Sequence, residues 1–138
     1  MIFNDKFLEH FKIGWRVEQA VQDPCNPLLE PKFPWDAGVV GCGHGTVLKD
    51  PIDGKFKAWV VSLPEDFDDG RGKTKFRLTY LVSDDGVKWD RPKLDICSYP
   101  GYPKTNILMD FDSGGRATYA SVFIDPKENE KEPYEMYI

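Results

Sequence analysis

Apolar and polar residues alternate along several short stretches of the chain. Residues 11–17 read FKIGWRV and residues 76–82 read FRLTYLV, with apolar or aromatic side chains at every second position. A period of two is typical of a β-strand that buries one of its faces. Residues 46–50 and 56–62 form two further strand-like runs, separated by the turn-forming sequence DPIDG at 50–54. The pattern therefore predicts short strands joined by tight turns.

The strands predicted between residues 46 and 94 make up one antiparallel unit. A turn at 84–86 (DDG) follows the strand at 76–82 and leads into a fourth strand around 88–94. Four consecutive strands of this kind are typical of a β-meander and of one propeller blade. Beyond them we expect short strands at 105–110 and 117–124. Eleven prolines and twelve glycines disfavour long helices, so the predicted fold class is all-β.

A strand–turn–strand pattern occurs twice in the chain. The sequence TVLKDP at 46–51, followed by FKAWV at 56–60, is matched by SVFIDP at 121–126, followed by YEMYI at 134–138. Thr46 and Ser121 begin the two copies and lie 75 residues apart. A hairpin repeat of this size indicates a blade-like array.

The repeat divides the chain into three parts. We expect an N-terminal strand and connector at 1–44, a complete first blade at 45–95 and an incomplete second blade at 105–138. The strand at 11–17 would then belong to the last blade of a complete ring. Fewer than two blades cannot close a ring, and they leave strand edges and apolar surface uncovered. We therefore expect the chain to be a piece of a larger propeller, and its partner to be the remainder of that propeller or a second copy through self-association.

Composition and charge narrow the range of functions. With 41% hydrophobic and 14% aromatic residues, the chain is too apolar for disorder. A net charge of −5 without a basic stripe argues against a nucleic-acid partner. The chain shows neither an apolar run of the ~18 residues needed to span a bilayer nor the pattern of a secretion signal. We therefore expect no membrane partner, and a soluble protein that is cytoplasmic by default.

The cysteines and acidic residues do not predict a metal site or a cofactor. Cys25, Cys42 and Cys97 are odd in number and lack the CxxC spacing of zinc sites, so we expect three free thiols. The acidic stretch at 64–72 lacks the ligand spacing of a calcium loop and is expected to be a solvated loop.

Several motifs, taken in their order, resemble the N-terminal part of five-bladed propeller glycosidases. They are NPLLEPKFPWD at 26–36, GTV at 45–47, GKFKAW at 54–59, SDDGVKW at 83–89 and TNI at 105–107. The fourth is similar to the S-x-D-G-x-x-W turn in blades of glycoside hydrolase families 32, 43 and 130. The resemblance implies a partial five-bladed β-propeller, with one full four-stranded antiparallel blade plus part of the next. It also implies a carbohydrate ligand and hydrolysis of glycosidic bonds.

The resemblance does not transfer the family's catalytic aspartates to this chain. In those enzymes the carboxylates stand just before the innermost strands, where one protonated and one ionised carboxyl group flank the scissile bond. His44 and Tyr119 fall near the corresponding positions here. Asp50 and Asp125, each followed by a proline, lie at the far end of their strands and are expected to form turns.

Five residues near the presumed funnel remain candidates for the site. Asp36 is the candidate catalytic acid or base, and Trp35 offers a flat face for a sugar ring. His44 lies between glycines and is suited to bind sugar hydroxyls, to transfer protons or to contribute to a metal site. Arg116 and Tyr119 are candidates for binding hydroxyls or an acidic group. The structural alternatives are core packing for Trp35, a capping carboxylate for Asp36 and ordinary loop or strand-end positions for the other three.

Three functional interpretations stay open, and with them the question whether the chain is an enzyme. The first is a glycosidase-like hydrolase of oligo- or polysaccharides, with Asp36 as acid or base and its partner carboxylates elsewhere. The second is a non-catalytic glycan-binding or interaction propeller that lacks the family's aspartates. The third is a β-sandwich interaction domain in which the similarity of the two repeats is accidental.

Overall fold

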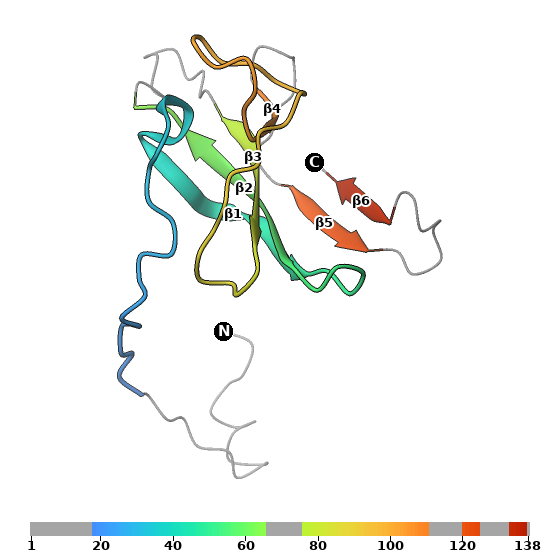
Figure 1. Cartoon of the computed structure of the whole chain (residues 1–138). Coiled ribbons are helices and arrows are strands. Elements are labelled where there is room, and N and C mark those ends of the chain that lie inside the picture. The colour runs from blue at the N-terminus through green and yellow to red at the C-terminus, as the bar shows by residue number, and fades with distance from the viewer. Residues whose placement is uncertain (1–17, 66–75, 111–119, 125–132, 138) are drawn as a thin grey trace, which may run out of the picture.

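The computed structural model describes residues 18–65, 76–110, 120–124 and 133–137, and of residues 42–44 the backbone alone. These residues form a short 3-10 helix and six strands (Figure 1): η1 Pro34–Asp36, β1 Val39–Lys49, β2 Phe56–Leu63, β3 Arg77–Ser83, β4 Ile107–Met109, β5 Ser121–Ile124 and β6 Tyr134–Tyr137. The described part of the chain contains no α-helix, and its strands pair antiparallel. The predicted all-β class is confirmed. The predicted strand at 11–17 lies outside the described residues.

The first sheet is a meander of four strands in the order β1-β2-β3-β4. Its fourth strand is β4, so the prediction of a fourth strand around 88–94 is wrong. That segment meets β3 only at an isolated bridge between Val82 and Asp90. Continuing that bridge as a ladder would set Pro92 opposite Tyr80, and a proline has no N–H to donate. The Tyr80 N–H and carbonyl are instead bonded to Asn106, at 2.8 and 3.0 Å.

The SDDGVKW motif is a structural turn, as its residue types suggest. The Ser83 hydroxyl accepts the N–H of Gly86 at 2.8 Å, and Gly86 has a φ of 77°. A residue in this left-handed region is best a glycine, because a Cβ is strained there. The indole of Trp89 donates to the Gly86 carbonyl at 3.1 Å and so packs back over its own turn.

Strand β1 begins at Val39, before the boundary that the sequence suggests at residue 45. Its pairing with β2 shifts between Val40 and Gly45, which marks a bulge. Gly41 lies in this bulge with a φ of 70°. The bulge interrupts the pairing while the strand continues through His44. It also interrupts the alternation of residue types, so the sequence pattern does not reveal the first half of β1.

The second sheet is the hairpin of β5 and β6, and it matches the β1–β2 hairpin residue for residue. Thr46 pairs with Trp59 in the first hairpin, and Ser121 pairs with Tyr137 in the second. These are equivalent positions in the two sequence repeats, so the repeat extends to the pairing register. In Figure 1 the arrows of β1 and β5 point the same way. The described residues form no closed ring, and the five-bladed propeller stays a prediction.

An apolar core joins the two sheets. Trp59 and Leu78 from the first sheet pack with Ala120 and Val122 from the second, and all four are buried. At roughly 1.5–3 kcal/mol for each large apolar side chain removed from water, this contact is a main source of stability. The opposite face of the first sheet has its own cluster of Ala58, Val60 and Leu81, against which Leu29 and Trp89 pack. The first sheet is therefore covered on both faces.

Candidate functional site

The candidate pair Trp35 and Asp36 lies in η1, whose first turn is capped by its own local sequence. Pro34 opens the helix, a position where its fixed φ and missing N–H cost nothing. One oxygen of Asp36, Oδ1, accepts the backbone N–H groups of Lys32 at 2.8 Å and Phe33 at 2.7 Å. The carboxylate thus caps the turn that carries it.

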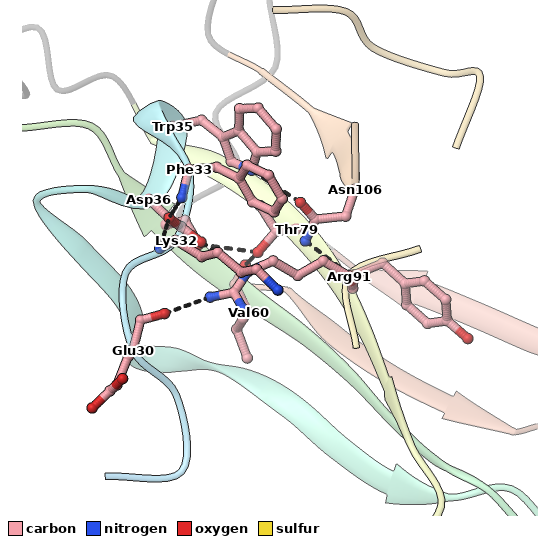
Figure 2. A network of polar contacts seen from close by, with 11 residues as sticks. Glu30, Lys32, Phe33, Trp35, Asp36, Val60, Thr79, Arg91 and Asn106 are labelled. Carbon is pink, nitrogen blue, oxygen red and sulfur yellow. Dashed lines mark hydrogen bonds and ion pairs between the residues drawn. The ribbon is translucent and has the colours of Figure 1, made fainter. Parts of the chain in front are cut away.

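The second oxygen of Asp36 is held by an arginine from a distant part of the chain. Arg91 Nε donates to Oδ2 at 2.9 Å, and Arg91 Nη2 donates to the Glu30 carbonyl at 2.7 Å (Figure 2). Only 1% of the Asp36 side chain and 9% of the Arg91 side chain is exposed. The ion pair fixes the connector before β1 to the segment after β3. Neither oxygen of Asp36 is left without a partner.

The indole of Trp35 is covered as completely as its neighbour. It is 2% exposed, and it stacks on Phe33 with a centroid distance of 4.6 Å and an interplanar angle of 7°. Its Nε1 donates to Asn106 Oδ1 at 2.9 Å, and the Asn106 amide in turn donates to the Tyr80 carbonyl at 3.0 Å (Figure 2). Trp35 is therefore part of the packing between η1 and the β3–β4 edge.

Of the five predicted site residues, the structure brings Trp35 and Asp36 together but describes no side chain of the other three. His44 lies in β1, where its backbone alone is described. Arg116 and Tyr119 lie outside the described residues. The predicted roles of all five in catalysis and substrate binding stay predictions.

A cavity of about 100 Å³ lies beside η1 and combines aromatic rings with cations. Tyr102 is 38% exposed at this site and meets Trp35 and Phe33 edge-on, at centroid distances of 5.2 and 6.0 Å. The residues that line the cavity are Phe33, Trp35, Arg91, Lys93, Tyr102, Lys104, Thr105 and Asn106. Ligand pockets are typically ~300 Å³ or larger, so this cavity has room for one end of a ligand.

A larger hollow of about 340 Å³ borders the same helix and is lined by Pro34, Ala37, Glu65 and Tyr99. The Tyr99 ring lies 5.5 Å from Trp35, and the Arg77 guanidinium lies 5.1 Å from the Tyr99 ring. Glu65 brings a carboxyl group to this hollow. Both hollows thus meet at η1, the element that carries the predicted pair.

Apart from Trp35, sequence reasoning did not single out the residues that line these hollows as site candidates. Tyr99 and Tyr102 belong to the segment YPGYP at 99–103, which the pattern marks only as a connector. Two tyrosines around a Pro-Gly turn were the available signal, since exposed aromatic residues on a tight turn are typical of binding loops. Arg91 carried no signal, because its partner Asp36 is far away in the sequence.

A second polar cluster joins the two sheets at the far end of the first hairpin. Asp50 forms the predicted turn, since its Oδ1 accepts the Ile52 N–H at 2.7 Å. Its other oxygen accepts hydrogen bonds from Lys57 Nζ and from the Tyr134 hydroxyl. Lys57 also donates to the Tyr134 oxygen at 2.7 Å and pairs with Asp53 at 2.9 Å. The turn carboxylate therefore also holds β6 against β2.

This cluster shifts the pKa values of its members. Burial alone raises the pKa of Asp50, but the hydrogen bonds from Lys57, Tyr134 and the Ile52 N–H outweigh it and lower that pKa to about 2. Burial lowers the pKa of Lys57, and its hydrogen bonds to Asp50, Tyr134 and Asp53 raise it well above its usual range. The ammonium and the carboxylate both remain charged at neutral pH.

We expect acid to weaken this cluster. Because the pKa of Asp50 is depressed from 3.8 to about 2 on folding, its contribution is complete above the unfolded value and is lost as the pH falls toward about 2. Chemical denaturation at about pH 5 and about pH 2.5 measures this loss. Asp50→Asn has no carboxylate to protonate, so its free energy of unfolding should fall less on acidification than that of the native chain. Equal losses in both would contradict the assignment.

Neither a metal-binding cluster nor a membrane-spanning helix occurs among the described residues. No three His, Cys, Asp or Glu side chains among them come close enough to hold a metal ion. No helix in this part of the chain is both long and apolar enough to cross a membrane. Cys25 and Cys97 are free thiols, and the side chain of Cys42 is among those not described.

Comparison with models of protein families, with curated proteins and with solved structures found no match.

Proposed function

We propose that the chain is part of a carbohydrate-binding protein of the propeller type, and that the two hollows beside η1 contact the glycan. The observation that carries this proposal is the group of partly exposed aromatic side chains, Phe33, Tyr99 and Tyr102, around these hollows. The faces of a sugar ring are apolar at their C–H groups, so they pack on aromatic rings, while a few polar groups fix the orientation of the hydroxyls.

The charge around the smaller cavity favours a glycan with acidic groups. Lys93 and Lys104 line it and are both exposed, and Arg91 closes one wall. Lys104 pairs with Asp95 at 3.1 Å, but both side chains are more than half exposed, so the pair stays accessible to solvent. Arg91 is paired with Asp36 and Lys104 with Asp95, so the three cations of the cavity exceed these two carboxylates by one. In a chain with a net charge of −5, this small local excess of positive charge would attract a uronate carboxylate or a sulfate.

Binding without hydrolysis fits the described carboxylates better than catalysis does. Glycosidic hydrolysis needs two carboxyl groups that flank the scissile bond. Asp36 is buried and both its oxygens are occupied, so substrate would have to displace an ion pair to reach it. Among the described residues that line the two hollows, Glu65 alone carries a carboxyl group. A hydrolase would therefore need catalytic carboxylates from residues other than these.

The propeller arrangement is part of the same proposal and is supported by the repeat. The two hairpins share their register, and the first strand of each lies beside the first strand of the other, with Thr46 bonded to the backbone on both sides of Ser121. Successive blades of a propeller pack in this manner around their axis.

Binding to a glycan panel tests the proposal. The panel would contain neutral xylan and fructan fragments and acidic oligogalacturonates, and we expect the acidic members to bind best. Tyr102→Ala should lower the affinity about tenfold, or ~1.4 kcal/mol, because it removes the exposed ring of the smaller cavity. Ile52→Ala is the control, since it removes an exposed apolar side chain from the turn between β1 and β2, outside both hollows. If no member of the panel binds, or if both variants bind equally well, the proposal fails.

A further inference from the structure

Three residues that attach the second hairpin to the first have exact counterparts on the second hairpin itself. The sequence repeat matches Thr46 with Ser121 and Leu48 with Phe123. The strand registers match Trp59 with Tyr137, because these residues pair with Thr46 and Ser121. Each set of three therefore occupies the same positions on its hairpin. We call the first set the inner face and the second set the outer face.

The three side chains of the inner face already contribute to the junction with the second hairpin. The hydroxyl of Thr46 donates to the Ala120 carbonyl at 3.3 Å and accepts the Val122 N–H at 3.0 Å. Trp59 is 6% exposed and packs with Val122, and Leu48 packs against the same cluster. One hydroxyl and two apolar side chains thus hold the first strand of the second hairpin.

The outer face has the same composition but is exposed. Phe123 and Tyr137 are 41% and 63% exposed, against 6% for Trp59. Their rings stack on each other at a centroid distance of 5.5 Å and an interplanar angle of 13°. Ser121, the counterpart of Thr46, is exposed beside them. A preordered apolar face with a hydroxyl at its edge is typical of an interaction surface rather than of scattered surface residues.

The first hairpin carries the complementary surface. In the existing junction, β5 presents the Ala120 carbonyl, the Val122 N–H and the buried side chain of Val122. The repeat places Gly45 and Val47 at these positions in β1. Val47 is 58% exposed, whereas Val122 is 5% exposed, and β1 is an edge strand of its sheet. One chain therefore offers both halves of a junction that it already forms once internally.

We infer that the outer face of one copy binds β1 of a second copy, head to tail. Ser121 Oγ would bond the Gly45 carbonyl and the Val47 N–H of the neighbouring copy, and Phe123 and Tyr137 would cover its Val47. The occupant is a second copy because the required strand is present on this chain: the outer edge of β1 pairs with no other described strand, and its Val47 is exposed. Since the two contacting surfaces differ, the contact is heterologous and leads to rings or open chains rather than to a symmetric dimer.

Sedimentation velocity over a range of concentrations tests this inference. We expect the mass of the native chain to rise above the 15.8 kDa of the monomer as the concentration increases. Phe123→Asp and Val47→Asp each place a charge at one half of the junction, so each variant alone should stay monomeric. Ile96→Asp adds the same charge at an exposed apolar side chain outside both halves of the junction and should associate like the native chain.

The mixture of the two variants is the decisive measurement. A copy with Val47→Asp keeps its outer face, and a copy with Phe123→Asp keeps its β1 surface, so the mixture should form one-to-one dimers and nothing larger. A native chain that is monomeric at all concentrations, single variants that still associate, or a mixture that stays monomeric would each overturn the inference. Far-UV circular dichroism checks the fold, and the milder pair Phe123→Ser and Val47→Ser replaces the charged pair if either of those is unfolded.

Discussion

Asp36→Ala should lower the free energy of unfolding by about 3–5 kcal/mol, the range for removing one partner of a buried ion pair. The substitution leaves the Arg91 guanidinium, which is 9% exposed, without its carboxylate. It also removes the acceptor for the N–H groups of Lys32 and Phe33 that form the turn before η1. Denaturation in urea, followed by tryptophan fluorescence, measures the loss.

The matched control for this variant is Asp95→Ala. Asp95 also pairs with a cation, Lys104, but its side chain is 78% exposed. Exposed pairs contribute about 0–1 kcal/mol, so this control should unfold almost like the native chain. If Asp36→Ala were as stable as the control but lost hydrolysis of a glycan that the native chain hydrolyses, the carboxylate would be catalytic rather than structural.

Lys57→Met should cost about 3 kcal/mol of stability, because it leaves the buried carboxylate of Asp50 without its cation. Methionine keeps the apolar stem, so the loss reports the charge and not the packing. The matched control is Lys55→Met: the Lys55 ammonium pairs with Asp84 at 2.9 Å, and the two side chains are 46% and 82% exposed. The control should cost no more than about 1 kcal/mol.

A double-mutant cycle shows whether this cluster links the two sheets. Tyr134 lies in β6 and bonds both Asp50 and Lys57, so Tyr134→Phe and Lys57→Met remove contacts of one network. Their combined effect should therefore differ from the sum of the single effects by at least about 0.5 kcal/mol. Additive effects would mean that Tyr134 and Lys57 stabilise the fold independently, so that the cluster does not couple the two sheets.

The sequence predicted the parts of the fold that depend on local chemistry. Alternation predicted β3, the turn at 50–54 marked the start of β2 as the return strand, and the repeat marked β5 and β6. The fourth strand was mispredicted because Pro92 has no N–H for a ladder and Asn106 takes the N–H and the carbonyl of Tyr80 that the segment would need. A local pattern does not reveal this competition, since Asn106 is distant from both segments in the sequence.

The candidate site was predictable only where its residues are neighbours in the chain. Trp35 and Asp36 stood out as a pair, but their surroundings depend on Arg91 and Asn106, which come from distant segments. Whether a tryptophan packs in the core or contacts a ligand depends on its burial, and burial is a property of the tertiary structure. The cavity itself arises because the 99–103 connector folds back onto η1, a contact that no periodicity encodes.

The long segment between β3 and β4 links the hollows beside η1 to the stability of β4. Residues 84–106 leave the sheet, carry Arg91, Tyr99 and Tyr102 around η1, and return only at the short outermost strand. Closing so long a loop costs conformational entropy, and the pairing of the three residues of β4 offsets little of this cost. A sugar bound to both this segment and η1 would hold the loop closed. Amide hydrogen exchange in β4 would therefore slow on binding, although the ligand does not touch that strand.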